Sequence, residues 1–175
     1  MSIGLILNPS QIPDGSIMDI NGKQLYLGNT FSGAIKSVNS PGTSETAFML
    51  LSNPATSGKS LFMFNQNMSV NSAATGATAI FRFYINPTVT TNGTTITPNN
   101  NRVNSQSPTS LMKAYSSPTV SANGTFLVDL VTSSQIGTLQ SNDFVILDPG
   151  NSLLVTLTAS AANIPVGMQL TWYEL

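Results

Sequence analysis

Thr78-Ala79-Ile80-Phe81-Arg82-Phe83-Tyr84-Ile85 is the segment from which we derive the fold class. Successive side chains of a β-strand point to opposite faces, so residues two apart share a face. In this stretch Ala79, Phe81, Phe83 and Ile85 fall on one face, and Arg82 and Tyr84 fall on the other. The pattern therefore predicts a half-buried strand with its apolar face on a core.

The same alternation recurs along most of the chain. It is clear over residues 152–159, where Leu153, Val155 and Leu157 share a face, and over 166–173, which ends in Trp172-Tyr173. No segment has helical periodicity, although Ser110–Tyr115 is compatible with one helical turn. The other predicted strands are Ser16–Ile20, Gln24–Gly28, Phe31–Val38, Thr46–Ser52, Ser60–Val70, Thr125–Thr132 and Asp143–Leu147.

Turn residues separate these strands. Asn21-Gly22 lies between two short apolar segments and predicts a two-residue hairpin, and Asn123-Gly124 is a second turn candidate. Asp148-Pro149-Gly150-Asn151 predicts a tight reversal, because proline fixes one φ and glycine permits a positive one. About ten strands with frequent turns predict an all-β antiparallel sandwich, with a jelly roll as the expected version.

Two regions depart from the strand pattern. Residues 1–20 contain Pro9 and Pro13 and are predicted to form an irregular N-terminal arm, so that 21–175 make a single β-sandwich domain. Asn86–Pro108 is rich in Thr, Asn, Pro and Ser and is predicted as one long polar loop, which a hairpin at Asn92-Gly93 would shorten. Loops of this length are usually functional or ordered by a partner.

The composition is poor in charge. Of 175 residues, 6 are Lys or Arg and 7 are Asp or Glu, and there is no His and no Cys. This is 7% charged residues, against about 25% in ordinary soluble domains. Hydrophobic residues make up 41%, enough for a folded core. The surface must therefore consist of hydroxyls, amides and glycine, which suits packing against other proteins.

This composition excludes several classes of function. A net charge of −1 with dispersed basic residues predicts no nucleic-acid partner, and no run approaches the roughly 18 apolar residues of a membrane span. Without His or Cys the usual catalytic bases and nucleophile pairs are missing, so we predict no enzyme activity and no catalytic residues. The aspartates show no spacing typical of a calcium site, and we predict neither a metal nor a cofactor.

One motif imitates a phosphate-binding loop. Asn53-Pro54-Ala55-Thr56-Ser57-Gly58-Lys59-Ser60 follows a predicted strand and ends in Gly-Lys-Ser. However, Asn53 stands where a P-loop has glycine, and Pro54 removes backbone freedom and an N–H donor. The following residues, Leu61 to Asn65, are typical of a strand, whereas phosphate binding uses a helix N-terminus. The motif therefore predicts a turn between two strands.

Three stretches carry a family resemblance. The first is Leu51–Leu61, a strand, a polar turn with Gly58-Lys59, and an apolar strand. The second is the Asn/Thr-rich insertion from Thr91 to Ser105, and the third is Val145–Leu153 together with the closing Trp172-Tyr173-Glu174. In their order and spacing these stretches, which span residues 51 to 174, resemble the decoration or cement proteins on the heads of tailed bacteriophages, which are small β-sandwich proteins.

The resemblance implies a virion structural protein that trimerises and binds the major capsid protein on the outer head surface, stabilising contacts between capsomers. It carries over no catalytic residues. We expect Asn86–Pro108 and residues 1–20 to contact partners, and the sandwich strands to form the homotrimer. Tyr173 is included because tyrosine is enriched at interfaces. The predicted contact residues are Asn92, Thr94, Asn99, Asn100, Arg102 and Tyr173.

Two alternatives stay open. A receptor- or glycan-binding module of a phage fibre or tail would use loop Asn and Thr, but Asn86–Pro108 lacks the aromatic residues typical of a lectin groove. A small jelly-roll capsid protein would self-assemble into shells, and we would expect a basic arm facing the genome, which is not seen. Residues 1–9 lack the features of a signal peptide, so we expect synthesis in the bacterial host cytoplasm and a final place on the virion.

Overall fold

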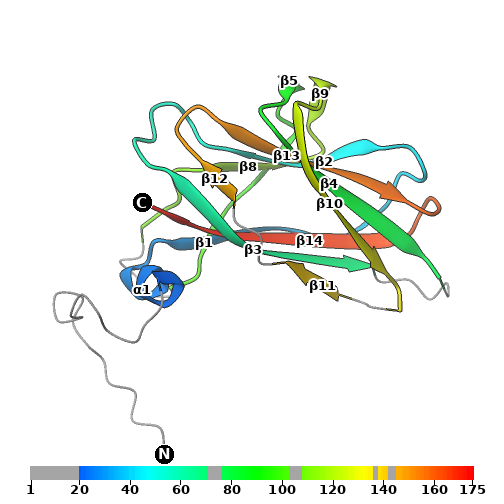
Figure 1. Cartoon of the computed structure of the whole chain (residues 1–175), viewed down its shortest axis with the longest axis horizontal. Helices are drawn as coiled ribbons and strands as arrows, with labels where there is room; N and C mark the ends of the chain where they lie inside the picture. Colours follow the sequence, from blue (N-terminus) through cyan, green and yellow to red (C-terminus); the bar gives the residue numbers. More distant parts are fainter. Residues whose placement is uncertain (1–19, 71–75, 103–107, 136–137, 142–144) are drawn as a thin grey trace, which may run out of the picture.

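The computed structural model describes residues 20–70, 76–102, 108–135, 138–141 and 145–175. Within them the chain forms two facing antiparallel sheets, and a two-stranded ribbon stands on the outer side of one (Figure 1). This confirms the predicted all-β antiparallel sandwich.

Sheet A contains β1 (Thr30–Asn39), β3 (Leu61–Val70), β7 (Asn99–Asn100), β11 (Thr138–Ser141), β12 (Val145–Leu147) and β14 (Pro165–Glu174). Sheet B contains β2 (Thr46–Ser52), β4 (Thr78–Ile85), β6 (Thr94–Ile96), β8 (Lys113–Ser116), β10 (Thr125–Ser133) and β13 (Ser152–Ala159). The ribbon consists of β5 (Thr88–Thr91) and β9 (Thr119–Ala122).

The core between the sheets is built from the faces that the alternation predicted. In β4, Ala79, Phe81 and Phe83 are buried, and the Phe81 ring meets Phe48 of β2 edge to face with 5.7 Å between centroids. Trp172 of β14 is fully buried in the same core. Each large apolar side chain buried in this way stabilises the fold by about 1.5–3 kcal/mol.

The strands pair in a nested order. β1 pairs with β14, β2 with β13, β3 with β12 and β4 with β10, so the chain folds as a long antiparallel ribbon wrapped around the core. Each sheet therefore mixes strands from both halves of the chain. Sheet A has the order β11-β3-β14-β1-β7 with β12 also on β3, and sheet B has the order β10-β4-β13-β2-β8-β6. This order leaves β10 and β6 at the edges of sheet B.

Residues 20–27 form a helix, α1 (Ile20–Leu27), where a hairpin and a strand were predicted. The predicted turn at Asn21-Gly22 and the predicted strand Gln24–Gly28 are therefore wrong. The apolar residues of α1 do not gather on one face, so the sequence has no helical period to detect. Of the predicted strand Ser16–Ile20, only Ile20 lies within the described residues.

The end of α1 explains why the helix stops where it does. Gly28 has a φ of 78°, its N–H donates to the Leu25 carbonyl, and the Asn29 N–H donates to the Gln24 carbonyl. This is the Schellman arrangement, in which a left-handed glycine satisfies the last helical carbonyls. The helix then leads directly into β1 and packs on β1 and β14. Among the described residues no helix is long and apolar enough to cross a membrane.

Ser110–Tyr115, which is compatible with one helical turn, does not form one, because β8 occupies its second half and pairs with β2. The residues before β8 are held by the buried carboxylate of Glu174 instead. This carboxylate accepts hydrogen bonds from Ser110 Oγ, from the Leu111 N–H at 3.0 Å and from Trp172 Nε1 at 3.2 Å. These donors are therefore used to satisfy a buried acceptor rather than to start a helix.

Two other turns are confirmed. Residues 53–60 join β2 to β3, so the segment that imitates a P-loop connects two strands and no helix follows it. Asp148–Asn151 reverses the chain between β12 and β13, with the Asn151 N–H donating to the Asp148 carbonyl at 3.1 Å and Gly150 at a φ of 90°.

Candidate interaction surface

Much of the segment predicted as one long polar loop, Asn86–Pro108, forms the short strands β5, β6 and β7 instead. β5 pairs with β9 and β6 pairs with β8, so that Thr88 faces Ala122 and Ile96 faces Ala114. The ribbon leaves sheet B at the β4–β10 pair, stands above its outer side and rejoins it beside β2 (Figure 1). We call residues 86–96 and 114–124 the arch. A local hairpin at Asn92-Gly93 is therefore wrong, because the strands on its two sides pair with β9 and β8 rather than with each other.

The arch bends at two places that use the same residue types. At one bend Asn86-Pro87 faces Asn123-Gly124, and at the other Ser117-Pro118 faces Asn92-Gly93. The residue before each proline has a positive φ, and so does each glycine. A Cβ on either glycine would lie 2.2 Å from a carbonyl oxygen of the facing chain. The bends therefore close only because glycine lacks that atom.

An internal repeat produces the two bends. Pro87-Thr88-Val89 recurs as Pro118-Thr119-Val120, and Asn92-Gly93-Thr94 recurs at the same spacing as Asn123-Gly124-Thr125. The two copies pair antiparallel, with Val89 opposite Val120, so an approximate two-fold axis passes through the arch. The separate turn signals do not reveal this repeat. The sequence signal that does is the recurrence of both motifs when the chain is aligned with itself.

Beneath the arch, a row of side chains crosses the outer face of sheet B. The row runs Phe126, Tyr84, Leu154, Leu50, Tyr115 and Thr95 from one edge of the sheet to the other. Leu154 and Leu50, at its centre, are 0% and 1% exposed although they lie outside the cluster between the sheets. Because the arch stands on this side of the sheet, it covers a second, smaller apolar layer.

Glu45 fixes the arch to the sheet. Its carboxylate accepts hydrogen bonds from Thr156 Oγ1 at 2.6 Å, from the Tyr84 hydroxyl at 2.9 Å and from Asn123 Nδ2 of the arch at 3.3 Å. It also pairs with the Arg82 guanidinium at 3.2 Å. The pKa of Tyr84 is raised above 10.0, first by burial and then by the Glu45 carboxylate, which accepts its hydrogen bond and repels the phenolate.

This raised pKa gives a pH prediction. Above the ordinary tyrosine pKa the unfolded chain loses the Tyr84 proton while the folded chain keeps it, so folding stability falls as the pH rises through that value. We expect the wild-type free energy of unfolding to decline more steeply than that of Tyr84→Phe between about pH 9 and 11. Urea unfolding at several pH values measures both slopes.

The matched variant for this prediction is Glu45→Gln. It removes the carboxylate but keeps the burial that is the largest cause of the raised pKa, so its slope should fall between the other two. Equal slopes for wild type and Tyr84→Phe would contradict the assignment.

β10 forms an exposed apolar edge of sheet B. It pairs with β4 on one side, and no described strand pairs with its other side. Phe126, Leu127 and Val131 are 53%, 40% and 52% exposed, and the Phe126 ring meets Tyr84 edge to face at 5.6 Å. Proteins usually protect such edges with charged residues, above all lysine, or with proline, and β10 contains one charged residue, the exposed Asp129, and neither lysine nor proline. This edge therefore has the chemistry of a protein-contact surface.

The structure brings four of the predicted contact residues to one side of the sandwich. Thr94 lies on β6 at the edge of sheet B, and Asn99 and Asn100 form β7 at the edge of sheet A, with Arg102 just beyond. Asn92 is exposed at a bend of the arch. Thr94 and Asn99 are exposed as well, so three of the six residues offer free surface to a partner.

The remaining predicted contact residues make internal interactions. Asn100 Nδ2 donates to the carbonyls of Gly28 at 2.7 Å and Pro108 at 2.8 Å, and the side chain of Arg102 lies against Gly28. Tyr173 is 4% exposed, and its ring stacks on Phe62 of β3 with 5.1 Å between centroids. A contact of Tyr173 with a partner stays a prediction.

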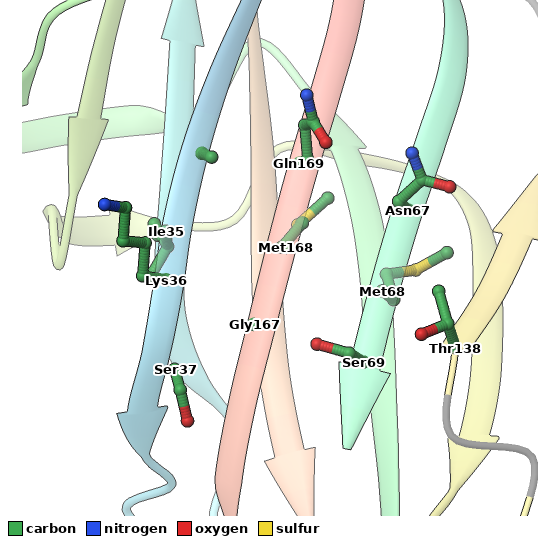
Figure 2. Close-up of a pocket in the computed structure, with 11 residues that line it drawn as sticks. Ile35, Lys36, Ser37, Asn67, Met68, Ser69, Thr138, Gly167, Met168 and Gln169 are labelled. Atoms are coloured by element: carbon green, nitrogen blue, oxygen red, sulfur yellow. The ribbon is translucent and has the colours of Figure 1, made fainter. Parts of the chain in front are cut away.

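The outer face of sheet A has a shallow depression of about 250 Å³ (Figure 2). Gly167 of β14 lies between Ser37 of β1 and Ser69 of β3, and Lys36 is the charged residue of the lining. One lysine among small and amide side chains provides no acid–base or nucleophile pair. The part of the chain that the structure describes contains no group of three or more His, Cys, Asp or Glu that could hold a metal ion.

Comparison with known proteins gives this surface no precedent. No protein-family model matches the chain, and no curated protein matches it. The resemblance to head decoration proteins therefore stays a prediction, and any function must be argued from the surface itself.

Proposed function

We propose that this chain is a non-enzymatic structural protein of a bacteriophage virion, a decoration protein on the outer surface of the head. It binds the major capsid protein, bridges neighbouring capsomers and associates with further copies of itself as a homotrimer. The nested strand pairing, with β1 on β14 and β2 on β13, supports the jelly-roll form of the sandwich.

The observation that carries the proposal is the arch. It projects from the sandwich, contains no charged residue, and presents the same Asn-Gly-Thr corner at both of its bends. A duplicated corner suits a protein that bridges two similar neighbours, because an exposed threonine follows the glycine at each bend, Thr94 at one and Thr125 at the other. Uncharged hydroxyls and amides also make contacts that depend little on salt, unlike exposed ion pairs.

The edge strand β10 supports self-association. Its exposed Phe126, Leu127 and Val131 and its unpaired side supply apolar area and backbone hydrogen bonds for another chain. Self-association would give each assembly several arches. Separating two capsomers would then require breaking every contact that spans them, which is how a cement protein resists internal pressure.

Mass measurement and head binding test this proposal together. We expect the purified chain to have three times its 18.4 kDa mass and to bind expanded heads of its source phage. Combining Phe126→Ser with Val131→Thr should weaken self-association by about a hundredfold, since central apolar contacts dominate interfaces. Thr94→Glu and Thr125→Glu should each weaken head binding about tenfold, a loss of about 1.4 kcal/mol.

Matched variants serve as controls. Ile146→Ser changes a residue that is 57% exposed on β12, away from β10, and should leave the mass unchanged. Thr43→Glu adds the same charge to an exposed loop outside the arch and should leave head binding unchanged. A chain that stays monomeric and binds no expanded heads would refute the proposal.

The nested strand order also supports a second candidate, a small jelly-roll capsid protein that assembles into shells. The same mass measurement separates the two. Closed particles formed by the chain alone would favour the shell protein, and discrete trimers that bind preformed heads would favour the decoration protein.

A further inference from the structure

The second half of β1 is an open sheet edge. β7 pairs only with Phe31 and Ser32, and no described strand lies on that side of Gly33 to Asn39. The Asn101 N–H donates to the Thr30 carbonyl, so Thr30 directs its backbone groups to the β7 side. The backbone N–H and C=O of residues two apart in a strand point to the same side. Those of Ala34, four residues after Thr30, therefore point to the open edge. A further strand has a place to pair here.

An apolar groove runs beside this edge. It has a volume of about 430 Å³ and lies between β1 and the β2, β6 and β8 strands of sheet B. Ile35, Val38, Phe48 and Ile96 supply its apolar walls, and its lining has no charged residue. Val38 is 41% exposed in this position. An apolar groove beside free backbone groups fits an extended segment with apolar side chains at alternate positions.

The chain itself contains such a segment before α1. Ile3-Gly4-Leu5-Ile6-Leu7 is uncharged and places Ile3, Leu5 and Leu7 at alternate positions. We propose that Ile3–Leu7 of the same chain pairs antiparallel with β1 and inserts these three side chains into the groove. The β1 bulge between Ile35 and Val38 lets Ile3 lie opposite Val38 and Leu5 opposite Ile35, on the groove side.

Polarity and reach favour the segment of the same chain over that of another copy. In an antiparallel pair Leu7 lies nearest the start of β1, which is where α1 joins it. Residues 8–19 can span up to about 40 Å, whereas the ten residues of β1 extend over about 33 Å. A tethered segment also competes at an effective concentration of about millimolar, above that of a second copy in dilute solution.

Amide hydrogen exchange measured by NMR on the full chain tests this inference. We expect the Ala34 amide to exchange at least about tenfold faster in Leu5→Ser than in wild type, because the inserted side chain is lost. Ile6→Ser changes a neighbouring apolar residue that points away from the groove, and it should leave Ala34 protected. The Val155 amide, in the centre of sheet B, reports on global stability and should be unaffected in both. Equal exchange of Ala34 in all three proteins would overturn the proposal.

A disulfide identifies which copy supplies the segment. The chain has no cysteine, so Ile3→Cys combined with Val38→Cys creates a single possible pair within each chain. Directly opposite residues of an antiparallel pair have Cα atoms about 4.5–5.5 Å apart, within the range that a disulfide spans. We expect a monomeric, internally bridged product. Disulfide-linked oligomers, or protection of Ala34 that rises with protein concentration, would assign the groove to a second copy and overturn the proposal. Neither readout involves heads, so this inference and the proposed function fail independently.

Discussion

Gly124→Ala is expected to destabilise the chain by at least about 3 kcal/mol. Gly124 has a φ of 91°, and a Cβ there would lie 2.2 Å from the Ile85 carbonyl oxygen. This oxygen is a backbone atom, so it cannot rotate away from the clash as a side chain could. Relieving this clash would separate the arch from β4 and expose the apolar layer beneath it. Urea unfolding followed by the fluorescence of the single, fully buried Trp172 measures the loss.

The control separates backbone strain from the steric clash. Gly58 also has a positive φ, 64°, but nothing lies within 4 Å of the position of its Cβ. Gly58→Ala should therefore lower the free energy of unfolding only by the strain of a left-handed alanine, about 1–2 kcal/mol. Gly93→Ala, at the other bend, should lower the free energy of unfolding as much as Gly124→Ala does, because its Cβ would lie 2.2 Å from the Ser116 carbonyl oxygen. Equal losses at Gly58 and Gly124 would show that the close approach does not matter.

The strands were predictable because each carries its own signal. Two strands have the bounds predicted from the alternation, Thr46–Ser52 and 152–159. A third, Thr78–Ile85, buries the face that was predicted to be apolar. Alternation is local, since it needs only a strand with one face on a core. It does not specify which strand is the neighbour.

The features that were missed depend on distant parts of the chain. Asn92-Gly93 has the signal of a local hairpin and Asn123-Gly124 that of a turn, but each pair bends the chain against a partner far away in sequence. Asn21-Gly22 has the same signal and lies in α1, because packing on β1 and β14 outweighs it. The edge strand β10, which we propose as a contact surface, was not among the predicted contact residues for the same reason. β10 becomes an edge only through the strand order of sheet B, which no local pattern specifies.

The turn that imitates a P-loop depends on the residue that breaks the motif. Asn53 is 1% exposed, and its Nδ2 donates to the carbonyls of Lys59 and Leu147, both at 2.8 Å. Its Oδ1 accepts a hydrogen bond from Ser57 Oγ at 2.6 Å. One amide thus satisfies acceptors on the β2–β3 turn and at the end of β12, which neither the glycine of a P-loop nor a smaller side chain can do.

Asn53→Ala is therefore expected to cost about 3 kcal/mol, because it leaves two carbonyls without their donor. Asn53→Asp has the same shape but places a carboxylate oxygen against both carbonyl oxygens, so it should cost more than Asn53→Ala. Asn39→Asp makes the same chemical change at an exposed position and should stay within about 0.5 kcal/mol of wild type. Urea unfolding ranks all three. If Asn53→Asp were as stable as Asn39→Asp, the amide would not hold the turn, because both the loss of its two donated hydrogen bonds and the burial of a charge should make the change costlier at the buried site.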